Sequence, residues 1–207
     1  MRGAKPPIAD NRHGILWPMR ALRFVLTIVF IPGIAFAQQS IHEVDFRNFS
    51  YPLTGSLLGH DGLEWLDTSG PQREIHLVAG SLLKKESGGF LLESVKYADL
   101  TGDGKDEAIV VLRYLTGGTQ TTNYVYIYTF RDGAPKLLAY CHTGDRAYSG
   151  LYRVYATGGT LVFDLYDPAK RSGDCCSNGV IVRRFRWKAG RFEPFGRPEE
   201  LGVPGEG

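Results

Sequence analysis

After its first 37 residues the chain alternates short runs of β-branched and aromatic residues with turn signals. Such runs predict β-strands, and this part of the chain has no long apolar stretch at helical spacing. We expect strands at 74–83, 90–98, 107–115, 123–130, 136–142, 151–156, 160–166, 180–188 and 192–195. We expect tight connections at pairs that supply positive φ angles, namely Gly88-Gly89, Asp132-Gly133, Gly158-Gly159 and Ala189-Gly190.

Two of the expected strands are apolar on both faces, and this bears on the fold class. Residues 108–112 and 124–128 have the pattern of central strands covered on both sides, whereas 160–166 suits a strand with one wetter face. A transmembrane barrel would alternate apolar and polar residues throughout, so these strands argue against one. We predict an all-β fold, an antiparallel meander forming a sandwich or small soluble barrel, with at most a short helical turn at 63–66.

Residues 1–37 have the layout of a secretory signal peptide. A basic stretch precedes the apolar run 24–35, and Ala35-Phe36-Ala37 fits a signal-peptidase site, so the exported chain would begin at Gln38. The alternative is a membrane anchor, but about 12 apolar residues are too few when spanning takes roughly 20. Met19 is a second possible start. We therefore expect a periplasmic or extracellular protein.

The remaining residues, 38–207, are expected to form a single β domain without a membrane span. The whole chain has 24 basic and 22 acidic residues, of which five basic and one acidic lie in 1–37. That leaves 19 basic and 21 acidic residues, a net charge of −2. This charge disfavours nucleic acid as a partner. We expect a monomer.

One segment, 97–111, has the spacing of a calcium loop. Calcium takes six to eight oxygen ligands, which short loops supply from alternate positions, with a glycine at position six for the turn. Here Gly104 stands at position six, and Val110 stands where an EF-hand would have its glutamate. The loop joins two expected strands. The predicted ligands, at positions one, three, five, seven and nine, are Asp99, Thr101, Asp103, the carbonyl of Lys105, and Glu107.

The motif Asp99-Leu-Thr-Gly-Asp-Gly-Lys-Asp-Glu107 resembles the calcium loop of FG-GAP and VCBS-type repeats. The resemblance implies side-chain ligands at Asp99, Thr101, Asp103 and Glu107. Two departures are a threonine at position three and a single copy of the loop, so the resemblance implies a local site and not a propeller. Over a longer span the chain resembles secreted bacterial proteins that have a D-x-T-G-D-G loop, a later Cys-Cys pair and a terminal aromatic strand. It is also similar to LppP/LprE-type lipoproteins, whose lipidated cysteine it lacks.

The alternative for this loop is a tight turn in which Asp99 and Asp103 accept backbone amides and no metal binds. If calcium binds, the ligand count predicts a dissociation constant on the order of 10⁻⁴–10⁻³ M. Its role would be to brace the two strands. Magnesium is disfavoured because it keeps its waters.

The chain has three cysteines, Cys141, Cys175 and Cys176, so one disulfide in an oxidising compartment would leave one thiol unpaired. A disulfide from Cys141 to Cys175 or Cys176 would close a loop of about 35 residues and stabilise the fold by roughly 4 kcal/mol. A bond between the adjacent pair, or a redox-active pair, is the alternative. The cysteine and histidine spacing offers no zinc site.

Two further segments carry polar groups. The loop 142–149 gathers His142, Asp145, Arg146 and Ser149, but neighbours in one loop rarely form a serine-hydrolase triad, so a polar turn is favoured. The basic stretch 183–191 suits either a solvated edge strand or contact with an anionic glycan or lipid head group. Trp65 is either a core residue or a sugar-stacking platform.

The leading hypothesis is an exported, calcium-braced β module without catalytic activity that binds a protein or a cell-envelope polymer. The alternative is a secreted hydrolase with its site in the 142–149 loop. The two differ in what mutation would do, because His142→Ala would abolish turnover only in the hydrolase.

Overall fold

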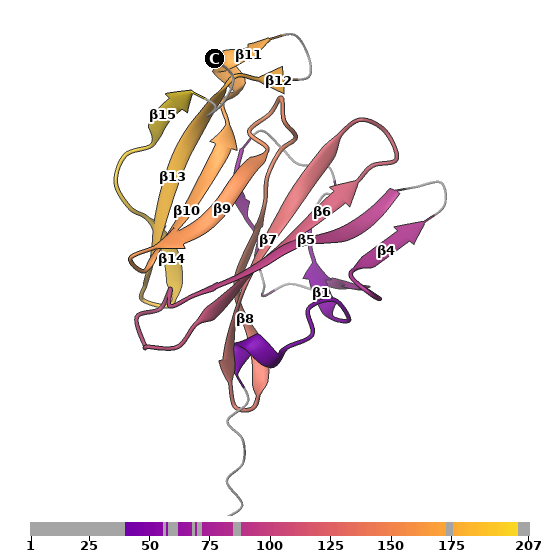
Figure 1. The fold of residues 1–207 in the computed structure, drawn as a ribbon, viewed down its shortest axis with the longest axis vertical. Coiled ribbons are helices and arrows are strands. Elements are labelled where there is room, and N and C mark those ends of the chain that lie inside the picture. Colours follow the sequence, from indigo (N-terminus) through magenta and orange to yellow (C-terminus); the bar gives the residue numbers. More distant parts are fainter. Residues whose placement is uncertain are drawn as a thin grey trace, which may run out of the picture. The chain divides into compact units, whose positions relative to one another are not determined.

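The computed structural model describes residues 40–55, 57, 62–67, 69, 72–84, 88–172 and 176–202, which belong to one compact unit, Gln38–Gly207. The expected signal peptide and Cys175 lie outside the described residues. The described part is all-β: its sheets are antiparallel and its helical elements are two 3-10 turns, η1 (Ile41–Glu43) and η2 (Pro168–Lys170). The predicted fold class is confirmed as a sandwich of sheets (Figure 1).

A six-stranded sheet forms the middle of the molecule. Its order is β2-β8-β7-β6-β5-β4, so four strands that follow one another in sequence pair as a meander at its centre. Hairpin turns such as Asp132-Gly133, with φ angles of 55° and 74°, join these strands as expected. The strands are β2 (Glu64–Trp65), β4 (Ser81–Lys84), β5 (Gly88–Ala98), β6 (Glu107–Leu115), β7 (Thr121–Arg131) and β8 (Ala134–His142).

A five-stranded sheet packs on one face of the six-stranded sheet. Its order is β14-β13-β10-β9, and β15 also pairs with β13. Both β14 and β15 lie along the same long strand, β14 near one end of it and β15 near the other. The strands are β9 (Leu151–Thr157), β10 (Thr160–Tyr166), β13 (Gly179–Lys188), β14 (Arg191–Pro194) and β15 (Glu199–Gly202).

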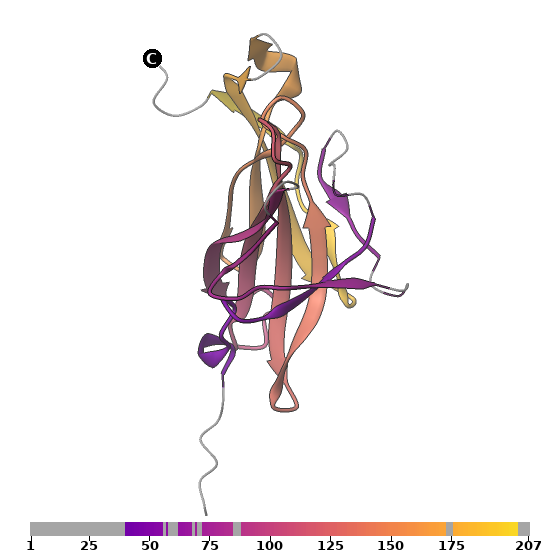
Figure 2. The ribbon, with the colours of Figure 1, turned by 90° about the vertical axis from the view of Figure 1, so that its right-hand side faces the viewer.

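A third layer, made by the N-terminal segment, covers the other face of the six-stranded sheet. It consists of η1 and the pair β1 (Ser50–Leu53) and β3 (Arg73–His76). In Figure 2 this indigo and purple segment crosses in front of the long strands, and the yellow C-terminal strands lie behind them. A small separate pair, β11 (Arg171–Ser172) and β12 (Cys176–Ser177), follows η2.

The six-stranded sheet therefore has two buried faces, as its apolar central strands predict. The face toward the N-terminal segment is called face one, and there Val110 and Tyr126 pack with Tyr51 and Leu77 of the third layer. The face toward the five-stranded sheet is called face two, and there Ile109, Val125 and Cys141 pack with residues that include Phe163. Alternate residues of β6 and β7 thus enter different cores, which explains why these strands have no polar face.

Three details of the predicted elements are wrong. The expected strand at 74–83 is broken into β3 and β4, because Ala79 adopts a φ of 52° and makes a turn with Gly80. The expected helical turn at 63–66 is instead the short strand β2, which pairs with the end of β8. The glycine pair at 88–89, expected as a connection, begins β5.

Candidate functional site

The predicted calcium loop, residues 99–106, joins β5 to β6 at one end of the six-stranded sheet. The strand–loop–strand placement inferred from the sequence is confirmed. Gly102 and Gly104 have φ angles of 78° and 80°, a left-handed conformation that glycine adopts without strain. The two glycines let the chain fold back over the carboxylate of Asp99.

Asp99 organises this loop through backbone amides. Its Oδ1 accepts a hydrogen bond from the Gly102 amide at 2.7 Å, and its Oδ2 accepts one from the Gly104 amide at 2.9 Å. Asp103 accepts one from the Lys105 amide at 2.9 Å. These bonds are the ones expected of the capped turn, so the loop holds its shape through its own aspartates.

Glu107, the predicted ligand at position nine, lies at the base of the loop and is fully buried. Its Oε2 accepts hydrogen bonds from the amides of Leu100 at 2.9 Å and Thr101 at 3.1 Å, and its Oε1 lies 3.4 Å from the Thr101 hydroxyl. Thr129 of β7 also bonds this carboxylate. Burial raises the pKa of Glu107, and these uncharged donors only partly oppose the rise.

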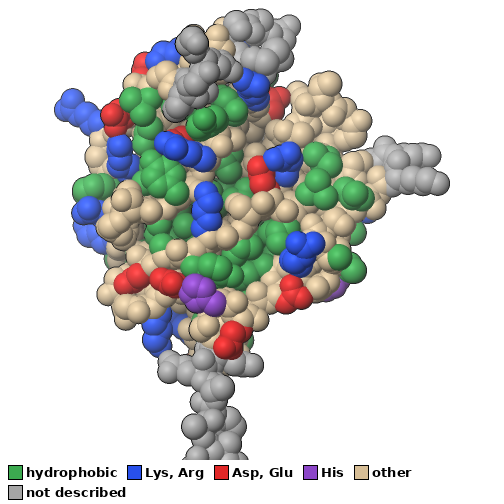
Figure 3. Space-filling model, viewed as in Figure 1, with side chains coloured by type: hydrophobic (Ala, Val, Ile, Leu, Met, Phe, Trp, Pro, Cys, Tyr) green, Lys and Arg blue, Asp and Glu red, His purple; other side chains and the backbone are tan. Residues whose placement is uncertain are grey.

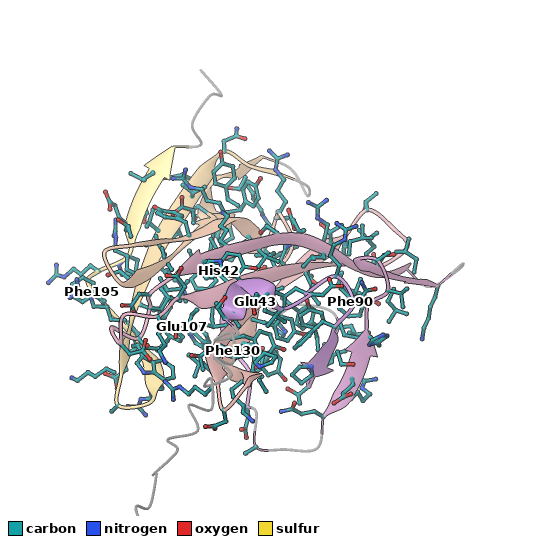
Figure 4. The ribbon with its side chains drawn as sticks, turned by 60° about the horizontal axis from the view of Figure 1, so that its bottom comes forward. His42, Glu43, Phe90, Glu107, Phe130 and Phe195 are labelled. Carbon is teal, nitrogen blue, oxygen red and sulfur yellow. The ribbon has the colours of Figure 1, made fainter. Side chains whose placement is uncertain are left out.

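The loop also contacts η1. His42 places its Nε2 2.9 Å from Asp106 Oδ2, and its ring lies 4.1 Å from the ring of Tyr97. Figure 4 shows His42 and Glu43 at the same end of the sandwich as Glu107. The contact between His42 and Asp106 spans 64 positions of sequence, and no local pattern marks it.

The arrangement agrees with a calcium loop in part. An ionised carboxylate has about four acceptor sites, so the amide bonds to Asp99 leave room for a cation. Thr101 and Glu107 are brought together, whereas the Asp103 carboxylate is turned to its own loop backbone. Among the described residues, no three histidine, cysteine, aspartate or glutamate side chains are grouped closely enough to hold a metal ion. The calcium site therefore stays a prediction.

The loop after β8 has the structure of a closed polar turn. Asp145 Oδ1 accepts the amides of Ala147 at 2.9 Å and Tyr148 at 3.1 Å, and the Asp145 carbonyl accepts the Gly150 amide at 2.6 Å. His142 is buried, with its Nε2 3.0 Å from Glu64 Oε2. Tyr148 of this loop is 38 % exposed, with the Arg171 guanidinium over its ring.

Cys141 corrects one expectation about the cysteines. Its thiol is free and fully buried on face two, so it is not bonded to Cys175 or Cys176. Burial raises its pKa well above the ordinary value, which keeps the sulfur protonated and unreactive. Any bond between Cys175 and Cys176 lies outside the described residues, because Cys175 and the side chain of Cys176 are not described.

The part of the basic stretch 183–191 that lies in β13, residues 183–188, divides between the two faces of that strand. The odd-numbered positions share the face of Phe185 in the core, and the even-numbered ones point to the outer face of the five-stranded sheet. On that outer face Arg184 pairs with Glu199 at 2.7 Å, and Arg186 lies 3.5 Å from the centre of the Phe195 ring. Trp65 packs in the core against Phe192, with ring centres 5.6 Å apart.

Within the described part of the chain no helix has the length and apolar character needed to cross a membrane. Comparisons with protein-family models, with curated proteins and with solved structures find no match to this chain.

Proposed function

We propose that this chain is an exported β-sandwich binding module whose β5–β6 loop is braced by calcium. The observation that carries the calcium part is the burial of Glu107 among uncharged donors at the base of an aspartate loop. A buried carboxylate without a cation is costly, and it either takes up a proton or binds a cation. From the spacing of the loop, we expect Asp99, Thr101, Asp103 and the Lys105 carbonyl to supply the other oxygens to that cation.

The outer face of the five-stranded sheet supports the binding part. Strand register places Arg153, Tyr155, Arg184 and Arg186 on this face. The Arg153 guanidinium lies 5.0 Å from the Tyr155 ring centre, and Arg186 stacks on Phe195. Figure 3 shows Lys and Arg side chains interspersed with hydrophobic ones where these strands lie. Guanidinium groups beside aromatic rings suit an anionic cell-envelope polymer better than a neutral one.

Thermal unfolding with and without calcium tests the brace. With a dissociation constant of about 10⁻⁴–10⁻³ M, about 10 mM calcium stabilises the fold by roughly 1.4–2.7 kcal/mol, which raises Tm by about 3–10 °C over a sample in chelator. Asp103→Asn keeps an acceptor for the Lys105 amide but loses the charge, so it should remove this rise. The matched control is Asp132→Asn in the β7–β8 turn, where asparagine also tolerates the φ of 55°.

An equal Tm in calcium and chelator would show that the loop is the metal-free turn. The same samples test the binding part on immobilised polygalacturonate, with neutral dextran as the reference. Arg186→Gln should reduce retention on polygalacturonate, and equal retention of the two proteins would rule out the outer face as the binding surface.

A further inference from the structure

A pocket of about 260 Å³ opens between the edges of the two main sheets. One part of its apolar wall comes from Trp65 of β2 and from Leu63, which precedes that strand. The other part comes from Phe185 and Pro194 of the five-stranded sheet. Arg183 also lines the pocket and adds a guanidinium group, while Arg184 borders it from the next position of β13. This pocket lies on the core side of β13, so it is separate from the outer face of the five-stranded sheet.

Arg183 is placed toward the core by strand register. It pairs with Phe163 of β10, and its neighbour on the same face, Phe185, pairs with Leu161. Those three apolar residues belong to the core on face two. An arginine in this row is unexpected, because a guanidinium held against apolar side chains is costly unless it has a partner.

No described residue supplies that partner. The other arginines of β13 are engaged: Arg184 with Glu199 at 2.7 Å and Arg186 with the Thr160 hydroxyl at 3.1 Å. Arg183 Nε is buried and has no hydrogen-bond acceptor among the described residues. Only the Nε atom is enclosed in this way. Arg183 lines the pocket, so its terminal nitrogens are open to a ligand there.

The wall beside Arg183 is aromatic and rigid. The Trp65 ring stacks on Phe192 and meets Phe163 and Phe185 edge-on, with ring centres 6.1 and 5.3 Å away. Its indole Nε1 is a second buried donor that has no acceptor among the described residues. The site thus combines a fixed aromatic surface with an unpaired positive charge.

We propose that this pocket binds a small carboxylate with an aromatic or branched apolar body. The carboxylate would take the two terminal nitrogens of Arg183, since a guanidinium and a carboxylate match as a bidentate pair. The apolar body lies against Trp65 and Phe185. The volume is that of about nine water molecules at roughly 30 Å³ each, which fits one ring and its carboxylate.

The test is a titration of the full chain with benzoate, followed by the indole N–H signal of Trp65 in NMR spectra. A Trp65→Phe variant assigns that signal against the other tryptophans. Benzamide, which has the same shape without the charge, and inorganic phosphate, which has charge without the ring, are the matched probes. We expect a saturable shift with benzoate and at least tenfold weaker binding of both other probes.

Arg183→Met should weaken benzoate binding at least tenfold, while Arg191→Met, on the same hairpin and paired with Glu193, should leave it unchanged. Melting curves show that both variants are folded. Equal binding of benzoate and benzamide, wild-type affinity in Arg183→Met, or no shift with benzoate would each overturn the proposal. The titration is run in calcium and in chelator, and the calcium response of Asp103→Asn tests the brace separately, so the pocket and the brace can fail independently.

Discussion

The two faces of the six-stranded sheet are equally buried but are held in different ways. Face two meets a regular sheet through aliphatic and phenylalanine side chains. Face one meets an irregular segment through tyrosines, whose hydroxyls bond its backbone: Tyr126 donates to the Pro52 carbonyl at 2.9 Å, and Tyr140 accepts the Thr54 amide at 3.0 Å. A layer with few ladder bonds of its own is fixed by side-chain hydroxyls. The five-stranded sheet has complete ladders and is held mainly by apolar contact, with one bond from Lys96 Nζ to the Val154 carbonyl at 2.7 Å.

High pH should have the largest effect, because it should unfold the protein through face one. Burial raises the pKa of four tyrosines of this core above the ordinary value of 10, so their phenols stay neutral in the fold and ionise in the unfolded chain. Stability is therefore full below pH 10 and falls above it, by about 1.4 kcal/mol per tyrosine per pH unit. The four are Tyr51, Tyr124, Tyr126 and Tyr128.

Circular dichroism and tyrosinate absorbance, measured together against pH, check this expectation. The absorbance of the buried tyrosines should rise with the loss of strand signal. Ionisation of all tyrosines in a protein that keeps its strand signal would contradict it.

Phe163→Ala should have the next largest effect, because it removes a fully buried ring from the middle of face two. The lost contacts and the cavity cost about 3–5 kcal/mol. Urea unfolding measures the change, with Val78→Ala, at a side chain that is 62 % exposed, as the control. A cost no larger than that of the control would mean that the five-stranded sheet does not depend on this core.

Tyr126→Phe should have a smaller effect, because it keeps the ring and removes only the hydroxyl. The Pro52 carbonyl then loses its donor, which costs about 1–3 kcal/mol. The control is Tyr155→Phe on the outer face, where the same change should be close to neutral. If the two variants unfold at the same urea concentration, the hydroxyls do not fix the third layer.

The sequence predicted the meander and its two covered strands because alternation and turn pairs are local signals. It did not predict the break between β3 and β4, because that turn is fixed from a distance: Arg47 donates to the Ala79 carbonyl at 3.0 Å, and Asn48 accepts the Ala79 amide at 2.9 Å. Strands of two to four residues, such as β2 and β15, are too short to show a period.

The candidate sites also combine features that the local sequence predicts with features that depend on distant segments. The spacing of aspartates and glycines placed the 99–106 loop between two strands, and Asp99 does organise it. The burial of Glu107 and the contact from His42 to Asp106 depend on other segments, so the loop motif does not predict them. The pocket at Arg183 needs Trp65, a residue of the other sheet, and the basic run around Arg183 concealed that this side chain faces inward.

The third layer has a consequence for the order in which the protein assembles. Its residues are made well before their partners, because their hydroxyl contacts lie 74 and 86 positions downstream, at Tyr126 and Tyr140. Until those strands are made, the segment carries Phe46 and Tyr51 with nothing to cover them. Closing such long loops is slow, and exposed apolar side chains invite aggregation meanwhile. We therefore expect the nascent chain to be prone to aggregation until β7 and β8 have been made.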